Sequence, residues 1–168
     1  MKHIFTSIFF SALNILSACS QQTYEQKLKS LYKGTVTLIQ PESLDSLMAG
    51  EDIVLLDTRS PEEFKVSHLK NAQFVDYDNF ELSEITVANK EKTVIVYCSV
   101  GYRSERVGEQ LKAAGYKNVY NLYGGIFQWK NEQRPVYNPE GEQTNSVHVY
   151  NKRWGQWLED GKGIKITN

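Results

Sequence analysis

A short apolar run in the second half of the chain, Thr93-Val94-Ile95-Val96-Tyr97, restricts the possible folds more than any other feature. Its residues are β-branched or aromatic and do not alternate with polar ones, which is typical of a strand covered on both faces of a parallel sheet. A helical pattern of apolar residues follows from Ser104 to Ala114, and Gly115 marks its end. The sequence therefore predicts a strand, a turn and a helix, with Cys98 at the carboxyl end of the strand.

Cys98 lies in the turn between this strand and this helix. Ligands of open α/β sheets bind at the carboxyl edge of the strands, where a helix presents unpaired N–H groups and the positive end of its dipole. Such a setting favours the thiolate form of a cysteine. An inert buried cysteine is the alternative, and it is common among free cysteines in general. The turn containing Gly101, which follows at once, favours the reactive interpretation.

The rest of the chain alternates between strand and helix patterns. Strands are expected at residues 36–39, 53–56, 73–75 and 119–122, and helices at 41–48, 61–64 and 126–132. Residues 23–32 are predicted to form a tether that ends in a short helix. The secondary structure of residues 80–89 is ambiguous and is expected to be helical in part. The alternation predicts an α/β fold of three layers, with a central, mainly parallel sheet flanked by helices.

The first 18 residues have the pattern of an export signal. Lys2 is followed by an apolar stretch from Ile4 to Leu16, which is shorter than the roughly 20 residues that span a bilayer. The end of the stretch, Leu16-Ser17-Ala18-Cys19, resembles the lipobox of bacterial lipoproteins, in which cleavage precedes a cysteine that carries a diacylglycerol. We expect Cys19 to be lipidated. An ordinary secretory peptide and a buried N-terminal helix are the alternatives.

These patterns predict an exported chain that is anchored in the bacterial cell envelope by lipid at Cys19. About 150 residues follow the signal, which is the size of one domain. We divide the chain into a lipoprotein signal peptide (1–18), an anchor and tether (19–35), a domain (36–136) and an extension packed on it (137–168). The formal net charge of −1 shows no basic excess, so we expect no nucleic-acid partner.

Four segments of the chain, in order, resemble a single rhodanese (sulfurtransferase) domain. They are Asp57-Thr58-Arg59 with Pro61-Glu62-Glu63-Phe64, then Ser67-His68-Leu69-Lys70-Asn71-Ala72, then Tyr97 to Ser104, and then Leu122 to Trp129. Ser67 departs from the family pattern, in which glycine more often precedes the histidine, and this departure does not touch the site. The resemblance implies the rhodanese-like fold and a sulfurtransferase activity that needs no metal or organic cofactor.

The chemistry of this site follows from the six residues from Cys98 to Arg103. A loop of this length that runs into a helix curls its N–H groups around the sulfur, which lowers the thiol pKa and stabilises a persulfide anion. Gly101 supplies the backbone freedom for the curl. We expect Cys98 to take sulfur from a small anionic donor such as thiosulfate and to pass it to cyanide or a thiol. The expected substrate-binding residues are Ser99, Val100, Gly101, Tyr102 and Arg103.

Several neighbouring residues have roles that the sequence leaves more open. Arg103 is expected to hold the oxygens of an anionic donor, with a solvated loop arginine as the alternative. The loop carries little other positive charge, which weakens the case for thiosulfate itself. Arg59 and Glu63 are predicted to form a structural ion pair, and His68 is predicted to pack or cap. Gly124-Gly125 is predicted to allow close backbone approach to the cysteine loop.

Two other function classes compete with a sulfurtransferase. Phosphatases and arsenate reductases of the same fold place five residues between cysteine and arginine, whereas four separate Cys98 from Arg103, which disfavours phosphatase activity. A catalytically weak binding or persulfide-carrier module is the second alternative, although an intact thiol in an oxidising space favours the enzyme. In the tail, Trp154, Trp157 and Leu158 have helical spacing and predict a packed helix, with a membrane or partner docking surface as the alternative.

Overall fold

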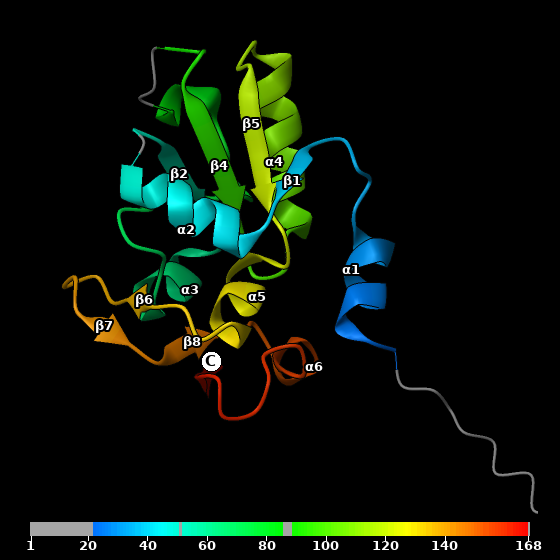
Figure 1. Ribbon diagram of the computed structural model, residues 1–168, viewed down its shortest axis with the longest axis vertical. Coiled ribbons are helices and arrows are strands. Elements are labelled where there is room, and N and C mark those ends of the chain that lie inside the picture. Colours follow the sequence, from blue (N-terminus) through cyan, green and yellow to red (C-terminus); the bar gives the residue numbers. More distant parts are fainter. Residues whose placement is uncertain (1–21, 51, 86–88, 168) are drawn as a thin grey trace, which may run out of the picture.

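A computed structural model describes residues 22–50, 52–85 and 89–167, and a five-stranded sheet forms its centre (Figure 1). The strand order is β1-β5-β4-β2-β3. The strands are β1 (Thr37–Ile39), β2 (Val54–Asp57), β3 (Gln73–Phe74), β4 (Thr93–Tyr97) and β5 (Asn118–Leu122). All neighbouring strands pair in parallel, so the predicted α/β fold is confirmed and this sheet is parallel throughout.

Strand β4 lies in the middle of the sheet and explains the apolar run in the sequence. Its side chains alternate between the two faces: Ile95 and Tyr97 belong to one hydrophobic cluster, and Val94 and Val96 to the other. All four side chains are fully buried. A strand that is covered on both faces needs apolar residues at every position, as the sequence predicts.

Helices cover both faces of the sheet. On one face, Val107 and Leu111 of helix α4 pack with Val94 and Val96. On the other face, helices α1, α2 and α5 contribute buried residues to the cluster around Ile95. The helices are α1 (Tyr24–Leu31), α2 (Pro41–Gly50), α3 (Pro61–Val66), α4 (Tyr102–Ala113) and α5 (Gly125–Asn131). The ambiguous segment contains the short 3₁₀-helix η1 (Leu82–Glu84).

The part of the predicted tether that the structure describes is packed on the domain. Thr23 and Gln26 form a capping box at the start of α1, and Leu28 is buried in the same cluster as Ile95. The Tyr24 hydroxyl donates a hydrogen bond to the carbonyl of Gly124 at 2.8 Å. The predicted signal peptide and Cys19 lie outside the described residues. Within the described part of the chain, none of the helices has the length and apolar character needed to cross a membrane.

The C-terminal extension forms small elements that pack on the end of the domain. They are β6 (Val136–Tyr137), β7 (Gln143–Thr144), β8 (Ser146–His148), α6 (Lys152–Gly155) and β9 (Ile164–Ile166). Strand β8 lies near α3, where the Ser67 hydroxyl donates to the carbonyl of Ser146 at 2.6 Å. The C-terminal helix is shorter than the sequence predicts: the predicted helix includes Leu158, but α6 ends at Gly155. Leu158 follows in a turn, where it is nevertheless fully buried.

Candidate active site

Cys98 follows the last residue of β4 and begins the loop that leads into α4. The backbone of Gly101, at the N-cap of α4, has a φ of 90°, a left-handed conformation that glycine adopts readily. Its N–H donates to Cys98 Sγ at 3.1 Å. The predicted curl of the loop around the sulfur is therefore present. The cysteine is 1% exposed, is free, and lines a pocket.

The electrostatic surroundings of Cys98 favour its thiolate. Burial raises the pKa of the thiol, but the positive charge of Arg103 and hydrogen bonds from the backbone of Ser104 and Val100 act in the opposite direction. A further hydrogen bond from the Ser104 side chain adds to their effect. The net result is a pKa below the ordinary value of a cysteine, as the sequence predicts for a thiol at the start of a helix.

Glu63 lies in α3, the helix that follows β2, and its side chain faces the cysteine loop. Glu63 is the third residue of α3 and forms a capping box with Ser60: its carboxylate accepts from the Ser60 N–H at 3.0 Å, and its N–H donates to the Ser60 hydroxyl at 3.3 Å. Burial raises the pKa of Glu63, but Arg103 and the other donors hold it at about 2. Glu63 is therefore a buried, ionised carboxylate.

Arg103 makes a two-pronged ion pair with this carboxylate. Its Nη1 and Nη2 atoms donate to Glu63 Oε2 and Oε1 at 2.7 and 2.8 Å, and Nη2 also donates to the Ser99 hydroxyl at 3.0 Å. Ser99 in turn donates to Glu63 at 2.6 Å. The side chain of Arg103 is 20% exposed and paired, so it is not the solvated loop arginine that was the alternative.

The predicted ion pair between Arg59 and Glu63 is wrong. Arg59 pairs with Asp57 at 2.7 Å and donates to the carbonyl of Ser67, and both members of the Arg59–Asp57 pair are fully buried. Asp57 lies two residues before Arg59, at the end of β2, and reaches its guanidinium within the same loop. Glu63 is turned towards the cysteine loop by the capping box and therefore meets Arg103. The pattern Ser60-x-x-Glu63 indicates the cap, but nothing in local spacing indicates the partner 40 residues away.

Two further elements, α5 and β5, support the cysteine loop. The N–H of Ile126 in α5 donates to the carbonyl of Cys98 at 2.9 Å. A Cβ atom added to Gly125 would lie 2.2 Å from that carbonyl oxygen, which confirms the predicted close backbone approach at Gly124-Gly125. Asn121 of β5 donates to the carbonyl of Gly101 at 2.9 Å. The loop is thus fixed by both neighbouring elements of the domain.

Tyr32, after α1, also holds the loop. Its hydroxyl donates to the carbonyl of Val100 at 2.8 Å and accepts from the N–H of Gly124 at 2.8 Å. A Cβ atom at Gly101 would lie 2.5 Å from this hydroxyl, so glycine is required there for space as well as for backbone conformation. Sequence reasoning missed Tyr32, because contacts over this distance along the chain leave no pattern in local spacing.

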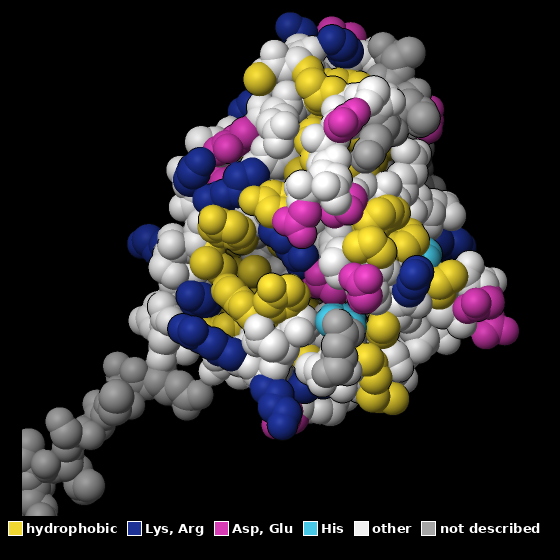
Figure 2. Space-filling view, turned by 180° about the vertical axis from the view of Figure 1, so that it is seen from behind, with side chains coloured by type: hydrophobic (Ala, Val, Ile, Leu, Met, Phe, Trp, Pro, Cys, Tyr) yellow, Lys and Arg dark blue, Asp and Glu magenta, His cyan; other side chains and the backbone are white. Residues whose placement is uncertain are grey.

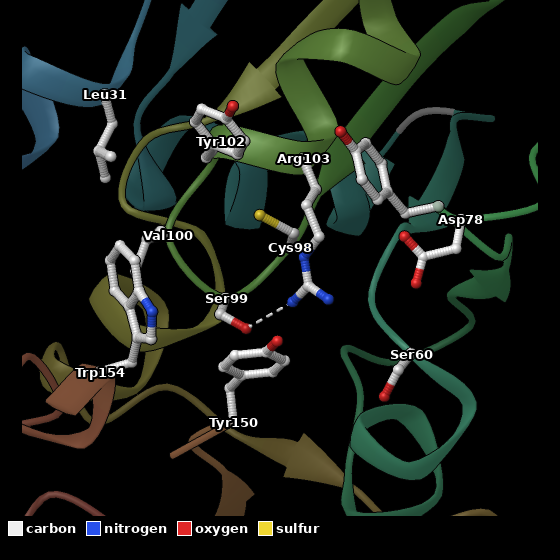
Figure 3. A pocket seen from close by; sticks show the side chains of 11 residues that line it. Leu31, Ser60, Asp78, Cys98, Ser99, Val100, Tyr102, Arg103, Tyr150 and Trp154 are labelled. Atoms are coloured by element: carbon white, nitrogen blue, oxygen red, sulfur yellow. Dashed lines mark hydrogen bonds between the residues drawn. The ribbon is translucent and has the colours of Figure 1, made fainter. Parts of the chain in front are cut away.

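The pocket above Cys98 has a volume of about 340 Å³ (Figure 3). It brings together five of the six predicted site residues, Cys98, Ser99, Val100, Tyr102 and Arg103, while Gly101 binds the sulfur through its N–H. The other lining residues are Leu31, Ser60, Tyr77, Asp78, Tyr150 and Trp154. Sequence reasoning missed these six; the helical spacing of Trp154 predicts packing, with a docking surface as the alternative, and gives no sign of the pocket.

His68, which the motif brings to attention, lies outside this pocket. Its ring stacks on Phe64 with centroids 4.3 Å apart, and its Nδ1 lies 3.0 Å from the carbonyl of Leu69. The prediction that it packs is confirmed. Across the described ranges, no group of three or more His, Cys, Asp or Glu side chains is arranged to hold a metal ion.

Comparison with known proteins decides the family. The model of the rhodanese-like domain matches residues 40–132, more than half of the chain. The chain belongs to the rhodanese-like family. This match includes the cysteine loop, Glu63 and α5, and it stops short of Leu31 and Tyr32 on one side and of Tyr150 and Trp154 on the other.

The rhodanese-like domain is also shared with longer curated relatives. A protein of Listeria monocytogenes is 36% identical over 105 residues, covering 59% of this chain and 33% of the relative. A protein of Acinetobacter baumannii is 31% identical over 138 residues, covering 76% and 42%. Both are named tRNA uridine(34) hydroxylase. The chain spans about a third to two fifths of the length of these relatives.

Solved structures agree with the rhodanese-like fold. A rhodanese-related protein from Thermoplasma volcanium is 28% identical, with a TM-score of 0.51 over 60% of this chain and 96% of that one. A protein from Bacillus halodurans aligns over 81% of this chain and 96% of its own, with a TM-score of 0.59. Its identity of 21% makes it similar in fold alone.

Proposed function

We propose that this rhodanese-like protein is a sulfurtransferase that carries sulfane sulfur as a persulfide on Cys98. The observation that carries the proposal is the environment of the sulfur: a backbone N–H from Gly101 at 3.1 Å, and a thiol pKa lowered by Arg103 and the start of α4. The same donors that favour a thiolate stabilise the terminal sulfur anion of a persulfide. The four-residue spacing between Cys98 and Arg103 favours this chemistry over phosphatase chemistry.

The reaction has two half-steps. The Cys98 thiolate attacks the outer sulfur of a donor such as thiosulfate; a new S–S bond forms, the S–S bond of the donor breaks, and sulfite leaves with the electron pair. The product on the protein is the Cys98 persulfide anion. A nucleophilic acceptor, cyanide or a thiol, then attacks the outer sulfur and releases the Cys98 thiolate. The balance closes without a metal or an organic cofactor.

The roles of the other predicted site residues are part of the proposal. Val100 and Tyr102 form walls of the pocket, and Gly101 binds the sulfur. The side chains of Ser99 and Arg103 are hydrogen-bonded to Glu63. They therefore contribute to donor binding through their backbone N–H groups and through the charge of the guanidinium. Arg103 also lowers the pKa of Cys98.

The shared domain, rather than the name of the longer relatives, supports this proposal. Hydroxylation of tRNA is the named activity of proteins of which this chain spans about a third to two fifths. The formal net charge of −1 offers no general attraction for nucleic acid. We therefore limit the proposal to sulfur transfer at Cys98.

A donor screen by intact-mass spectrometry tests the proposal. The purified protein without residues 1–21 is incubated with thiosulfate, mercaptopyruvate or polysulfide, and Cys98→Ser is treated in parallel. We expect the unmodified sequence to gain one sulfur atom with at least one donor, and the serine variant to gain none. Failure of all three donors would overturn the enzymatic function and leave the binding module as the better account.

We also propose that the mature protein is exported and anchored in the bacterial cell envelope through lipid on Cys19. The charged start, the short apolar stretch and the small residue before Cys19 support this location. Growth with a labelled fatty acid is expected to label the wild-type protein and not Cys19→Ala. Equal labelling of the two proteins would contradict lipidation.

A further inference from the structure

The wall of the pocket above Cys98 is largely apolar and aromatic. Trp154 and Tyr150 come from the C-terminal extension, Leu31 comes from α1, and Val100 and Tyr102 come from the cysteine loop and the start of α4 (Figure 3). The first three lie outside residues 40–132, the range matched by the rhodanese-like family. The N-terminal segment and the extension of this chain therefore add an apolar wall to a site that the family domain provides.

The charges around the pocket do not suit a compact dianion. Of the pocket-lining residues in the described chain, Arg103 alone carries a fixed positive charge, and Glu63 neutralises it through two hydrogen bonds. Asp78 adds a negative charge to the lining. A donor with two negative charges must therefore lose its water in a site with little net positive charge, which is costly.

Two other cations contact the aromatic wall instead of lining the pocket. The guanidinium of Arg106 lies 3.8 Å from the ring centroid of Tyr102, and it pairs with Glu105 at 2.9 Å. Lys27 Nζ lies 5.3 Å from the ring centroid of Trp154. Figure 2 shows this side of the molecule, where hydrophobic side chains gather around a hollow with Lys and Arg along one flank. These two positive charges therefore lie over the aromatic rings and do not line the pocket.

The volume of the pocket also exceeds what a small inorganic ion fills. A pocket of about 340 Å³ lies at the lower end of the roughly 300–1,000 Å³ range of small-molecule sites. An apolar group next to the reacting sulfur would bury surface against Trp154 and Tyr150, and this burial favours binding. Thiosulfate has no such group.

We infer that the sulfur compound exchanged at Cys98 carries an apolar or aromatic organic group, which packs against Trp154 and Tyr150. This inference rests on the proposed function and names its substrate class: organic sulfane-sulfur compounds, with one negative charge at most, in preference to thiosulfate. For an organic thiosulfonate, the Cys98 thiolate attacks the outer sulfur and the S–S bond breaks. The organic sulfinate leaves with the electron pair, and the persulfide anion remains on Cys98.

Two donors with the same reacting group test the inference. Benzenethiosulfonate and methanethiosulfonate differ only in the organic group, so kcat/KM for each is measured with a common thiol acceptor, and the ratio of the two values is compared between variants. Differences in intrinsic reactivity cancel in that comparison. The ratio is kcat/KM for benzenethiosulfonate divided by kcat/KM for methanethiosulfonate. We expect Trp154→Ala to lower this ratio by about tenfold, and Tyr150→Ala to lower it by less.

Ile164→Ala serves as the matched control. Ile164 belongs to the same C-terminal extension and is 59% exposed, close to the 57% of Tyr150, but it does not line the pocket. We expect the ratio to stay unchanged in this variant. Because Tyr150 is so exposed, its alanine variant is expected to fold even where Trp154→Ala does not, and it then decides the question alone.

The outcomes separate the inference from the proposed function. An unchanged ratio in Tyr150→Ala and in folded Trp154→Ala would overturn the inference while sulfur transfer itself stands. Higher kcat/KM for thiosulfate than for both thiosulfonates would also overturn it. Loading of Cys98 by none of the donors would overturn the proposed function and this inference together.

Discussion

Glu63 is a buried carboxylate whose charge depends on its neighbours. It is fully buried, and it accepts hydrogen bonds from the Ser60 N–H, the Ser99 hydroxyl and the two guanidinium nitrogens of Arg103. These donors favour the ionised form, so the pKa of Glu63 in the folded protein is about 2. In an unfolded chain the pKa of a glutamate is about 4.3. The folded pKa is therefore depressed.

Ionised Glu63 therefore stabilises the folded state at pH values above the pKa of the unfolded chain. This stabilisation is lost as the pH falls towards 2. We expect Glu63→Gln to lower the free energy of unfolding by about 2 kcal/mol at pH 7, and by much less at pH 3. Urea unfolding at the two pH values measures this. Glu140→Gln, in the exposed turn between β6 and β7, is the control and should change stability little at either pH. An equal loss for Glu63→Gln at both pH values would contradict the account.

At the residue scale, the sequence predicts those features that depend on local geometry. Cys98 after a buried strand, and Gly101 and Gly125 where the backbone turns or approaches closely, all follow from local pattern and lie where expected. The partner of Arg103 does not follow, because the ion pair joins two loops that only the folded sheet brings together. The ion pair predicted between Arg59 and Glu63 does not form, because the buried carboxylate of Asp57 is the partner of Arg59.

At the scale of elements, the segment around α1 is part of the framework that holds the cysteine loop. Tyr32 follows α1 and joins the cysteine loop to the start of α5 through one hydroxyl group. Glu105 of α4 anchors the same segment by accepting from the N–H groups of Lys33 and Thr35 at 2.9 and 3.0 Å. The position of the cysteine loop therefore depends on residues that precede the family domain.

Tyr32→Phe removes both hydrogen bonds with little change of shape. It leaves the carbonyl of Val100 and the N–H of Gly124 without this partner, and we expect a loss of about 1–3 kcal/mol in unfolding free energy. We also expect slower loading of Cys98, because the loop is held less firmly. Thermal unfolding and the rate of persulfide formation measure the two effects.

Tyr123→Phe is the matched control for this variant. Tyr123 packs edge-on against Tyr32, with centroids 6.3 Å apart, and its hydroxyl makes no hydrogen bond within the described part of the chain. We expect this variant to match the wild type in stability and in loading rate. Equal behaviour of the two phenylalanine variants would show that the Tyr32 hydroxyl does not hold the loop.

Hydrophobic periodicity identifies most elements of the central sheet and its helices, because burial imposes the pattern directly. Strand β4 and helix α4 are the clearest cases. Periodicity is weak before β1: residues 23–32 are predicted to be a tether that ends in a short helix, and the helix α1 that forms there packs on the domain although Leu28 is its one fully buried residue. In the extension, Gly155 packs on Val149 and α6 ends there, so that helical spacing overestimates the helix.

At the scale of the whole molecule, one hydrophobic cluster joins the sheet to both flanking segments. Val147, Val149 and Leu158 of the extension are buried in the same cluster as Ile95 of β4 and Leu28 of α1. The extension is thus packed on the domain and also supplies Tyr150 and Trp154 to the pocket. Its stability and the shape of the site are linked through this shared core.

Leu158→Ala tests this link. Leu158 is fully buried, so its truncation should cost about 2–5 kcal/mol of unfolding free energy for the whole domain. Ile164→Ala, in the same extension but exposed, should change it by less than about 0.5 kcal/mol. Denaturant unfolding, followed by tryptophan fluorescence and by circular dichroism, measures both variants. A small loss for Leu158→Ala would show that the extension is not part of the cooperative core.

We propose that Cys98 receives a sulfur atom and passes it on. A single-turnover experiment with a donor labelled at its outer sulfur tests this most directly: the protein is loaded, freed of donor, and then mixed with cyanide or a thiol. We predict one labelled sulfur atom per chain, located on Cys98, and its complete appearance in the acceptor with recovery of the unmodified protein. Label that stays on the protein, or that is found in the acceptor when Cys98→Ser is used, would contradict the account.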